Sequence, residues 1–546
     1  MSVPPTHAAL PGRPELWLAA TPLVLAPAYP PLGWSPLAWI ALVPVVWLLR
    51  SGPGGPWRWL GLGYAFGLVQ AAWQLRWLPR AVLEVGGLPA PLFVPFALAT
   101  VLFFATGHAL VLAATRWAWL RWGLHPGWSL ALLLTAHDVL AGVAPFGGNP
   151  WGSLAATQAH TIAARLLVPL AGGSALVLAL GLVNGLWAAA LSRWLRSPAV
   201  SASPDAPRAR PRRWTGWAHT LRGPGPALVA AALLTALLAA PWPAAQVPAG
   251  SGSAAGWRAL LVSGGVAPGA PATRPPEGER LRRYLARTLD ALRALPSTAD
   301  SAPAPALIVW PESAAAQPVE RGKTLVALAD AAGLWGADLL LGSDAVERGR
   351  TTNAAYLVQA RPFDFVRYDK RVLVPFGEYV PRGFRWLLPG KITAGEDDYA
   401  AGAALPVLPW RGQVLGLAIC FESILPAHVR AATLAGGQAL VVLANDVWLT
   451  PAAAAQHVQL TALQGLAVGR DVLFVAEGGW LAHLADGRVL REAPSGGQAL
   501  LVLPRWRGGR TPWVRWGYAP LAVLCALVAV AAGWHRRSGA RPVSGR

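Results

Sequence analysis

Long apolar segments recur through the first 240 residues and once more near the C-terminal end, and they constrain the fold more than any other feature. They lie at 16–30, 34–49, 57–78, 90–114, 128–143, 162–191, 226–240 and 516–534. Backbone in hydrocarbon must satisfy its hydrogen bonds internally, so such segments predict membrane-spanning helices. The chain is 54% hydrophobic and only 13% charged, which is typical of several spans. We therefore predict a bundle of about eight transmembrane helices.

The arginines predict the orientation of this bundle. If both chain ends are cytoplasmic, sixteen arginines near the apolar segments fall on the cytoplasmic side and three on the other. This asymmetry follows the positive-inside rule. It predicts a multi-pass protein of the cytoplasmic (inner) membrane, with the region between residues 241 and 513 on the periplasmic or extracytoplasmic side. The net charge of +20 is explained by the arginines that orient the bundle in the membrane, so nucleic-acid binding is not expected.

Composition divides the chain into successive parts. We predict an N-terminal membrane domain of about seven spans at 1–242, with a basic cytoplasmic loop near 193–224. An α/β domain follows at 257–505, then a membrane span at 516–535 and a cytoplasmic tail at 536–546. In the α/β domain, short apolar runs that indicate buried strands alternate with amphipathic helical patterns. Such alternation predicts stacked sheet and helix layers with chemistry at the strand ends.

A free thiol lies inside the predicted α/β domain. Cys420 ends the apolar run 414–419, and Pro426 shortly after it is suited to open a helix. The only other cysteine, Cys525, lies in the C-terminal apolar segment, so Cys420 has no partner for an internal disulfide. At a strand-to-helix turn, backbone N–H groups favour a thiolate. We therefore predict that Cys420 is a nucleophile.

Two ionisable residues beside other predicted strands complete a candidate catalytic set. Glu312 follows the apolar run 306–310, and Lys370 lies in RYDKRVLVPFGEYVP at 367–381. Only three of the 46 basic residues are lysines, which suggests a need for a compact ammonium here. A carboxylate can take the thiol proton, and an ammonium can stabilise an oxyanion. Taken singly, the three residues also fit a solvated loop carboxylate, a surface charge and a small buried side chain.

Three motifs in this order resemble a known enzyme superfamily. They are VWPES (309–313), YDKRVLVPFGEYVP (368–381) and AICFES (418–423). The set resembles the nitrilase (carbon–nitrogen hydrolase) superfamily with its Glu-Lys-Cys triad. The long lysine motif, with apolar segments on both sides of the domain, is similar to the apolipoprotein N-acyltransferase family. GGNPW (147–151) and ANDVW (444–448) match that family as well. The resemblance implies a multi-span α-helical membrane bundle and an extracytoplasmic nitrilase-like αββα sandwich.

The resemblance also implies a reaction in two halves. Glu312 would deprotonate Cys420, whose sulfur attacks the sn-1 ester of a phospholipid and forms a thioester. The α-amino group of the diacylglyceryl-cysteine of an apolipoprotein would then take the acyl chain as an amide. Lys370 would stabilise the oxyanion in both halves, while Glu378 and Glu422 orient the lysine or the incoming amine. The implied partners are a phospholipid donor, a diacylated lipoprotein acceptor and the bilayer.

Further residues have supporting roles by the same resemblance. Phe421, Asn445 and Trp448 are expected to support the site or contact substrate, and no metal or organic cofactor is needed. Phe384, Trp386, Leu387 and Leu388 form an apolar cluster between polar residues, which fits either core packing or a loop that gates lipid entry. The chain is expected to act as a monomer.

Some positions depart from the family pattern, and two other functions stay open. Phe421 stands where the family usually has tyrosine, the first strand runs into Ser263 and two glycines, and the stretch LQGLAVGRD (463–471) is unusual. One alternative is a membrane-tethered amidase that hydrolyses its thioester with water. The other is a catalytically silent scaffold that binds lipoproteins.

Overall fold

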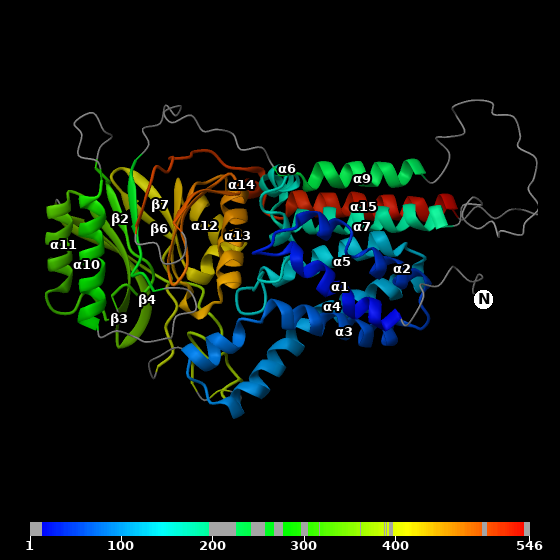
Figure 1. Cartoon of the computed structure of the whole chain (residues 1–546), viewed down its shortest axis with the longest axis horizontal. Coiled ribbons are helices and arrows are strands. Elements are labelled where there is room, and N and C mark those ends of the chain that lie inside the picture. Colours follow the sequence, from blue (N-terminus) through cyan, green and yellow to red (C-terminus); the bar gives the residue numbers. More distant parts are fainter. Residues whose placement is uncertain are drawn as a thin grey trace, which may run out of the picture.

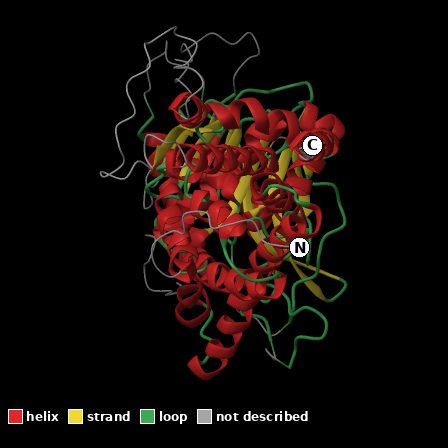
Figure 2. Cartoon of the chain, turned by 90° about the vertical axis from the view of Figure 1, so that its right-hand side faces the viewer, coloured by secondary structure: helices red, strands yellow, loops and turns green. Residues whose placement is uncertain are grey.

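A bundle of helices and a layered α/β domain lie end to end along the molecule (Figure 1). The computed structural model describes residues 14–195, 225–241, 257–266, 277–295, 304–315, 317–360, 362–386, 388, 390–392, 397–493 and 499–539. Seen from the bundle end, helices cover most of the view and the strands lie behind them (Figure 2). Most of the predicted basic loop and the end of the predicted tail fall outside these residues.

The bundle is built from helices of very different length. Its α-helices are α1 (Pro14–Leu25), α2 (Val43–Ser51), α3 (Pro56–Gln74), α4 (Ala90–Trp122), α5 (Pro126–Ala141), α6 (Ile162–Ala171), α7 (Ser174–Leu195), α9 (Gly225–Ala239), α14 (Pro512–Trp516) and α15 (Ala519–Gly539). Short helical turns join them at η1 (Ala26–Ala28), η2 (Ser35–Trp39), η3 (Arg80–Val85) and η4 (Leu154–Gln158). Among the described helices, α4 and α7 are long and apolar enough to cross a membrane. The count of eight spans stays a prediction.

The apolar segment 162–191 was expected to form one span, and this is wrong. It divides into α6 and α7 at Gly172, whose φ of +77° places it in a region that ends a helix. Pro169 lies just before the break. An apolar run alone carries no sign of such a break, because glycine and proline also occur inside transmembrane helices.

Small residues allow a close helix contact in the bundle. Gly63 and Gly67 of α3 lie against Ala109 and Ala105 of α4, so that a Cβ added to Gly63 would lie 2.5 Å from the Ala109 Cα. Small residues four apart let two helix backbones approach closely, and the gain comes from dispersion contacts. The α3–α4 pair therefore depends on the absence of side chains at these two glycines.

Two six-stranded sheets form the α/β domain. The first has the order β12-β1-β2-β3-β4-β5, and the second has the order β11-β10-β9-β8-β7-β6. The strands of the first are β1 (Ala259–Val262), β2 (Leu307–Val309), β3 (Asp338–Glu347), β4 (Arg350–Ala360), β5 (Phe363–Asp369) and β12 (Ala499–Val502). Those of the second are β6 (Val407–Trp410), β7 (Gln413–Ile419), β8 (Ala439–Asn445), β9 (Val472–Glu477), β10 (Leu481–Ala485) and β11 (Arg488–Ala493). In each sheet a parallel centre has antiparallel neighbours.

The two sheets pack face to face between two layers of helices. Leu261 and Leu307 of the first sheet share a core with Leu417 and Val441 of the second. Helices α10 (Glu277–Arg293) and α11 (Thr324–Trp335) cover the outer face of the first sheet, and α12 (Pro426–Leu434) and α13 (Pro451–Val468) cover that of the second (Figure 1). Strands buried on both faces read as unbroken apolar runs, as the sequence indicated. The predicted nitrilase-like α/β domain is confirmed.

Helix α13 belongs to both parts of the molecule. Its Leu460 and Leu463 share one apolar core with Ala163 and Val168 of α6. The amide of Gln456 donates to Gln74 Oε1 at 3.0 Å, so polar contacts cross the same boundary. Figure 1 shows α13 at the junction of the sheets and the bundle. The α/β domain is therefore packed against the bundle and is not tethered by a linker alone.

We predict that Gly63→Ala separates α3 from α4. The added methyl group meets backbone atoms that cannot rotate away, and overpacking of this kind costs about 1–3 kcal/mol. Thermal unfolding in detergent should show a clear decrease in Tm. Gly61→Ala is the matched control, because nothing lies within 4 Å of a Cβ at this position of the same helix. Equal Tm values for the two variants would contradict the close contact.

Candidate active site

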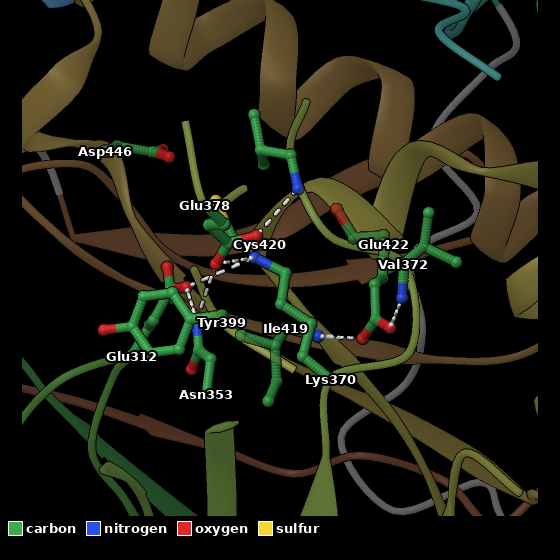
Figure 3. Close-up of polar contacts among 12 residues, drawn as sticks. Glu312, Asn353, Lys370, Val372, Glu378, Tyr399, Ile419, Cys420, Glu422 and Asp446 are labelled. Atoms are coloured by element: carbon green, nitrogen blue, oxygen red, sulfur yellow. Dashed lines mark hydrogen bonds and ion pairs between the residues drawn. The ribbon is translucent and has the colours of Figure 1, made fainter. Parts of the chain in front are cut away.

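Strand ends from both sheets bring three of the expected residues together. Glu312 follows β2, Lys370 follows β5, and Cys420 follows β7 at the start of the 3₁₀ turn η6 (Cys420–Ile424). The first two come from one sheet and the cysteine from the other, so the cluster lies between the sheets at one end of the sandwich (Figure 3). The chemistry-bearing side chains therefore converge where the strands stop, as layered α/β folds favour.

The ammonium of Lys370 lies between two carboxylates. Its Nζ is 2.9 Å from Glu378 Oε1 and 3.5 Å from Glu312 Oε1, and the lysine side chain is 1% exposed. Asn353 Nδ2 donates to the same two oxygens, at 2.7 Å to Glu312 and 2.9 Å to Glu378. Burial lowers the pKa of Lys370, but Glu378 and Glu312 more than reverse this effect, so its net pKa is raised. The lysine is a permanent buried cation.

Cys420 lies in an unusual backbone conformation. Its φ is +51°, in the left-handed region that non-glycine residues rarely adopt. The residue is partly exposed, whereas its neighbours Glu312 and Lys370 are buried. A hydrogen bond from the thiol lowers the pKa of Glu312, although burial keeps that pKa raised overall. The sharp turn thus brings the thiol within hydrogen-bonding reach of the Glu312 carboxylate.

The surroundings of Cys420 favour the neutral thiol, whereas the turn alone suggested a thiolate. Burial raises the pKa of Cys420, the charge of Glu312 raises it further, and Lys370 offsets only part of this, so the pKa lies well above its usual range. Burial, the largest of these causes, therefore outweighs the effect of the turn. A raised pKa on Glu312 suits it to accept the thiol proton during attack.

Glu378 and Glu422 have different places. Glu378 contacts the lysine directly, and its second oxygen accepts from the backbone N–H of Val374 at 2.8 Å. Glu422 is fully buried and does not touch the lysine; it accepts from the backbone N–H of Arg371 at 2.7 Å and of Ile419 at 2.9 Å. Glu422 thereby ties the loop after Lys370 to the strand before Cys420, and it does not orient the lysine or an amine by direct contact.

The remaining expected site residues surround the cluster. Phe421 is partly buried against the core that includes α13. The side chain of Asn445 caps the turn η7 (Asp446–Trp448) by accepting from Val447 N at 3.3 Å, and its backbone forms a hydrogen bond with the thiol that lowers the Cys420 pKa. Trp448 packs against an apolar cluster that includes Leu75 and Leu78 of the bundle and Leu388 of the α/β domain.

The four expected gate residues do not behave alike. Trp386 is 80% exposed, and Phe384 packs edge-on against Phe376 and Phe146. Leu388 is fully buried between the α/β domain and the α3–α4 region, so core packing, one of the two interpretations that the sequence left open, describes this residue. Leu387 lies outside the described residues.

A cavity of about 780 Å³ lies beside the loop that follows Lys370 and is lined from both domains, and Glu312, Lys370 and Cys420 are not among its lining residues. Phe146 and Gly147 from the bundle face Arg371, Val372 and Tyr399 across it. This opening is large enough for a flexible organic substrate. Within the described ranges, no group of three or more acidic, histidine or cysteine side chains is arranged to hold a metal ion; the absence of a cofactor stays a prediction.

Sequence reasoning missed three polar residues around the cluster. Asn353 bridges the two carboxylates, and Tyr399 donates to Asp344 at 3.1 Å beside them. Burial raises the pKa of Asp344 to about 6. Asn353 ends the polar run 350–353 at the start of β4, directly before the apolar residues 354–358, so the sequence does not distinguish it from an ordinary polar strand end.

Comparison with known proteins agrees with this architecture. Residues 22–195 match the apolipoprotein N-acyltransferase N-terminal domain, and residues 281–468 match the carbon-nitrogen hydrolase family. Proteins of Geobacter metallireducens, Pseudomonas aeruginosa and Gloeobacter violaceus, each named apolipoprotein N-acyltransferase, are 28% identical to the chain. These alignments cover 85%, 93% and 93% of this chain and 83%, 93% and 91% of the relatives.

The α/β domain thus places the molecule among the enzymes of the nitrilase, or carbon–nitrogen hydrolase, superfamily. The bundle matches a second, more specific family model and the relatives align across both parts, so the chain is similar over most of its length to proteins named apolipoprotein N-acyltransferase. Among solved structures, a mutant amidase from Nesterenkonia sp. AN1 aligns over 49% of this chain and 96% of its own, with 16% identity and a TM-score of 0.35. A score this low adds nothing to the assignment.

Replacing Asn353 by alanine should shift the acid side of the profile of acylation rate against pH to higher pH. The Asn353 amide lowers the pKa of Glu312, so its loss raises that pKa and protonates the base at a pH where the wild type is active. We expect the rate of Cys420 acylation at neutral pH to fall about tenfold, as for one lost hydrogen bond to a charged group.

The rate of acylation against pH measures this effect. Thr352→Val is the control, because Thr352 lies next to Asn353 on β4 but bonds Asp369 at 2.7 Å instead of the cluster. A pH profile for Asn353→Ala that coincides with that of Thr352→Val would show that the amide does not tune the base.

Proposed function

We propose that the chain transfers an acyl chain from a phospholipid, through a thioester on Cys420, to the α-amino group of a diacylated lipoprotein. The observation that carries the proposal is the buried cluster in which Glu312 and Lys370 flank Cys420 beside the bundle. The similarity of the bundle and of the whole chain to apolipoprotein N-acyltransferases supports the choice of donor and acceptor. A hydrolase would need no second domain lining its cavity.

The first half-reaction begins from the neutral thiol. As the sulfur attacks the ester carbonyl, its proton moves to Glu312 Oε, and the new C–S bond converts the carbonyl into a tetrahedral oxyanion. Lys370 stabilises this negative charge. When the C–O bond breaks, Glu312 returns the proton to the departing alkoxide, which leaves as lysophospholipid. The raised pKa of Glu312 favours both transfers, because the proton is neither held too weakly nor too strongly.

The second half-reaction uses the same groups in reverse. The neutral α-amino group of the acceptor attacks the thioester carbon, and Glu312 takes one of its protons. The C–S bond then breaks, and the sulfur regains a proton as the amide forms. Lys370 again neutralises the oxyanion, and Glu378 keeps the ammonium in place through its 2.9 Å contact. One preorganised donor of this kind is worth about 10²–10³ in rate.

The position of the site supports supply of the donor from a bilayer. The cavity is lined partly by Phe146 and Gly147 of the helical domain, and the helices α4 and α7 are apolar enough to lie across a membrane. We place the α/β domain on the extracytoplasmic side of the inner membrane, because the arginines of the bundle gather at the opposite ends of the apolar segments. Trp386, which projects from the loop beside Phe384, is proposed to insert at the lipid interface.

Thioester capture tests this function. Membranes that contain the wild type, incubated with a phospholipid labelled in its sn-1 chain, should acquire label on Cys420 and pass it to a diacylated lipopeptide. Cys420→Ala should abolish labelling, and Glu312→Gln should slow it by about 10²–10⁴ because the base is gone. Label released as free fatty acid while the lipopeptide stays unlabelled would indicate a hydrolase, and absence of label from wild-type protein would indicate a scaffold.

Replacing Trp386 by serine should slow labelling from phospholipid vesicles several-fold while leaving the thermal stability unchanged, because the exposed ring supports contact with lipid and not the core. Leu334→Ser is the control, since Leu334 is 89% exposed on α11 at the far end of the molecule (Figure 1). If both variants form thioester at the wild-type rate, Trp386 has no part in lipid entry.

A further inference from the structure

A buried chain of polar groups lies behind Cys420, and the reaction steps above do not use it. Asp446 Oδ1 is 2.9 Å from His457 Nδ1, and His457 Nε2 is 3.0 Å from Ser423 Oγ. Asp446 belongs to the turn after β8, His457 to helix α13 and Ser423 to the turn that starts with Cys420. Their order matches that of a Ser-His-Asp catalytic triad.

Ser423 is nevertheless not a second nucleophile. Its side chain is 1% exposed, and its Oγ is also 2.9 Å from Thr461 Oγ1, so no substrate carbonyl can approach it. His457 and Asp446 are buried as well. These three residues have no access to substrate, so they cannot act as a catalytic triad. We therefore ask which neighbouring group they position.

The group they contact is the backbone of the nucleophile. His457 Nε2 lies 3.3 Å from the carbonyl oxygen of Cys420. That residue has a φ of +51°, a conformation that persists only when surrounding contacts enforce it. The ring of His457 thus contacts the Asp446 carboxylate through Nδ1, and it contacts both the Ser423 hydroxyl and the Cys420 carbonyl through Nε2. A proton on each ring nitrogen is the arrangement in which the carboxylate and the carbonyl both accept from the ring. The histidine is carried by the long buried helix α13, a rigid support.

Asp446 carries an independent sign of function. Its Oδ2 is buried and, within the described residues, has no hydrogen-bond partner. Gly479 leaves room for this oxygen, because a Cβ at that position would lie 2.7 Å from it. A half-unsatisfied buried carboxylate is costly, so purely structural packing would favour a neutral side chain. Its charge also raises the pKa of Cys420.

We propose that Asp446 and His457 are positioning residues for the nucleophile: the carboxylate orients the ring of His457 through Nδ1, and the contact of Nε2 with the carbonyl of Cys420 holds the turn that presents the sulfur. The proposal rests on the proposed function only in taking Cys420 as the nucleophile. Loss of the contact should leave the sulfur misplaced with respect to Glu312, and a misplacement of about 1 Å can cost 10²-fold in rate.

Two variants of the full-length protein separate this role from simple packing. Glutamine can place an amide nitrogen near the position of Nε2, whereas asparagine reaches only the position of Nδ1. We expect His457→Gln to keep alkylation of Cys420 by iodoacetamide within about fivefold of wild type, and His457→Asn to slow it by about 10²-fold. Cys525→Ser serves as the common background, so that one thiol is measured.

Asp446→Asn provides a second measurement that does not depend on how well the histidine variants fold. It keeps the shape of the side chain and removes the charge, so the pH profile of alkylation should move to lower pH. Thr433→Val, a buried change on α12 away from the turn, should leave that profile in place.

Equal alkylation rates for the two His457 variants, or an unmoved profile for a folded Asp446→Asn protein, would overturn the proposal. Iodoacetamide needs no lipid, so these results stand whether or not the wild type forms a thioester from phospholipid. Failure of lipid labelling with normal alkylation would count against the proposed function alone.

Discussion

The buried ammonium of Lys370 is the constraint on which the site depends. A cation that is 1% exposed is tolerable only when it is paired and hydrogen-bonded, and here two carboxylates and one amide complete the arrangement. Removing one member would leave an unpaired buried charge, so the strand ends that carry these groups are fixed relative to one another. Burial and the charge of Glu312 raise the pKa of the adjacent Cys420 thiol, and Lys370 offsets part of this rise. A protonated sulfur beside a ready base limits side reactions with water and oxidants between turnovers.

The sequence carries enough information to bring Glu312, Lys370 and Cys420 to one edge of the domain, because each follows an apolar run and such runs end together in layered sheets. It does not carry the direction of the Cys420 pKa. Turn geometry predicts a thiolate, whereas burial beside a carboxylate depends on packing between two sheets that the local pattern cannot describe. The role of Asn353 was not predicted for the same reason, because the sequence of its strand does not indicate which side chain its amide contacts.

The helical part was harder to predict in detail. Apolar composition indicates membrane helices but gives no boundary within a continuous run, so the break at Gly172 between α6 and α7 was missed. Leu388 was grouped with Trp386 because the two are near in sequence and equally apolar. In the fold one is buried against the α3–α4 region and the other faces outward. The hydrophobicity of a side chain predicts that it tends to be buried, but it does not predict which residues it packs against.

Helix α13 packs against both parts of the molecule. One of its faces covers the second sheet, and another packs against α6 of the bundle. A fragment cut out at residues 257–505 would therefore carry an uncovered strip of leucine and alanine and would tend to self-associate. A shift of α6 against the second sheet would also reach the turn at Cys420 through α13, because His457 stands on that same helix.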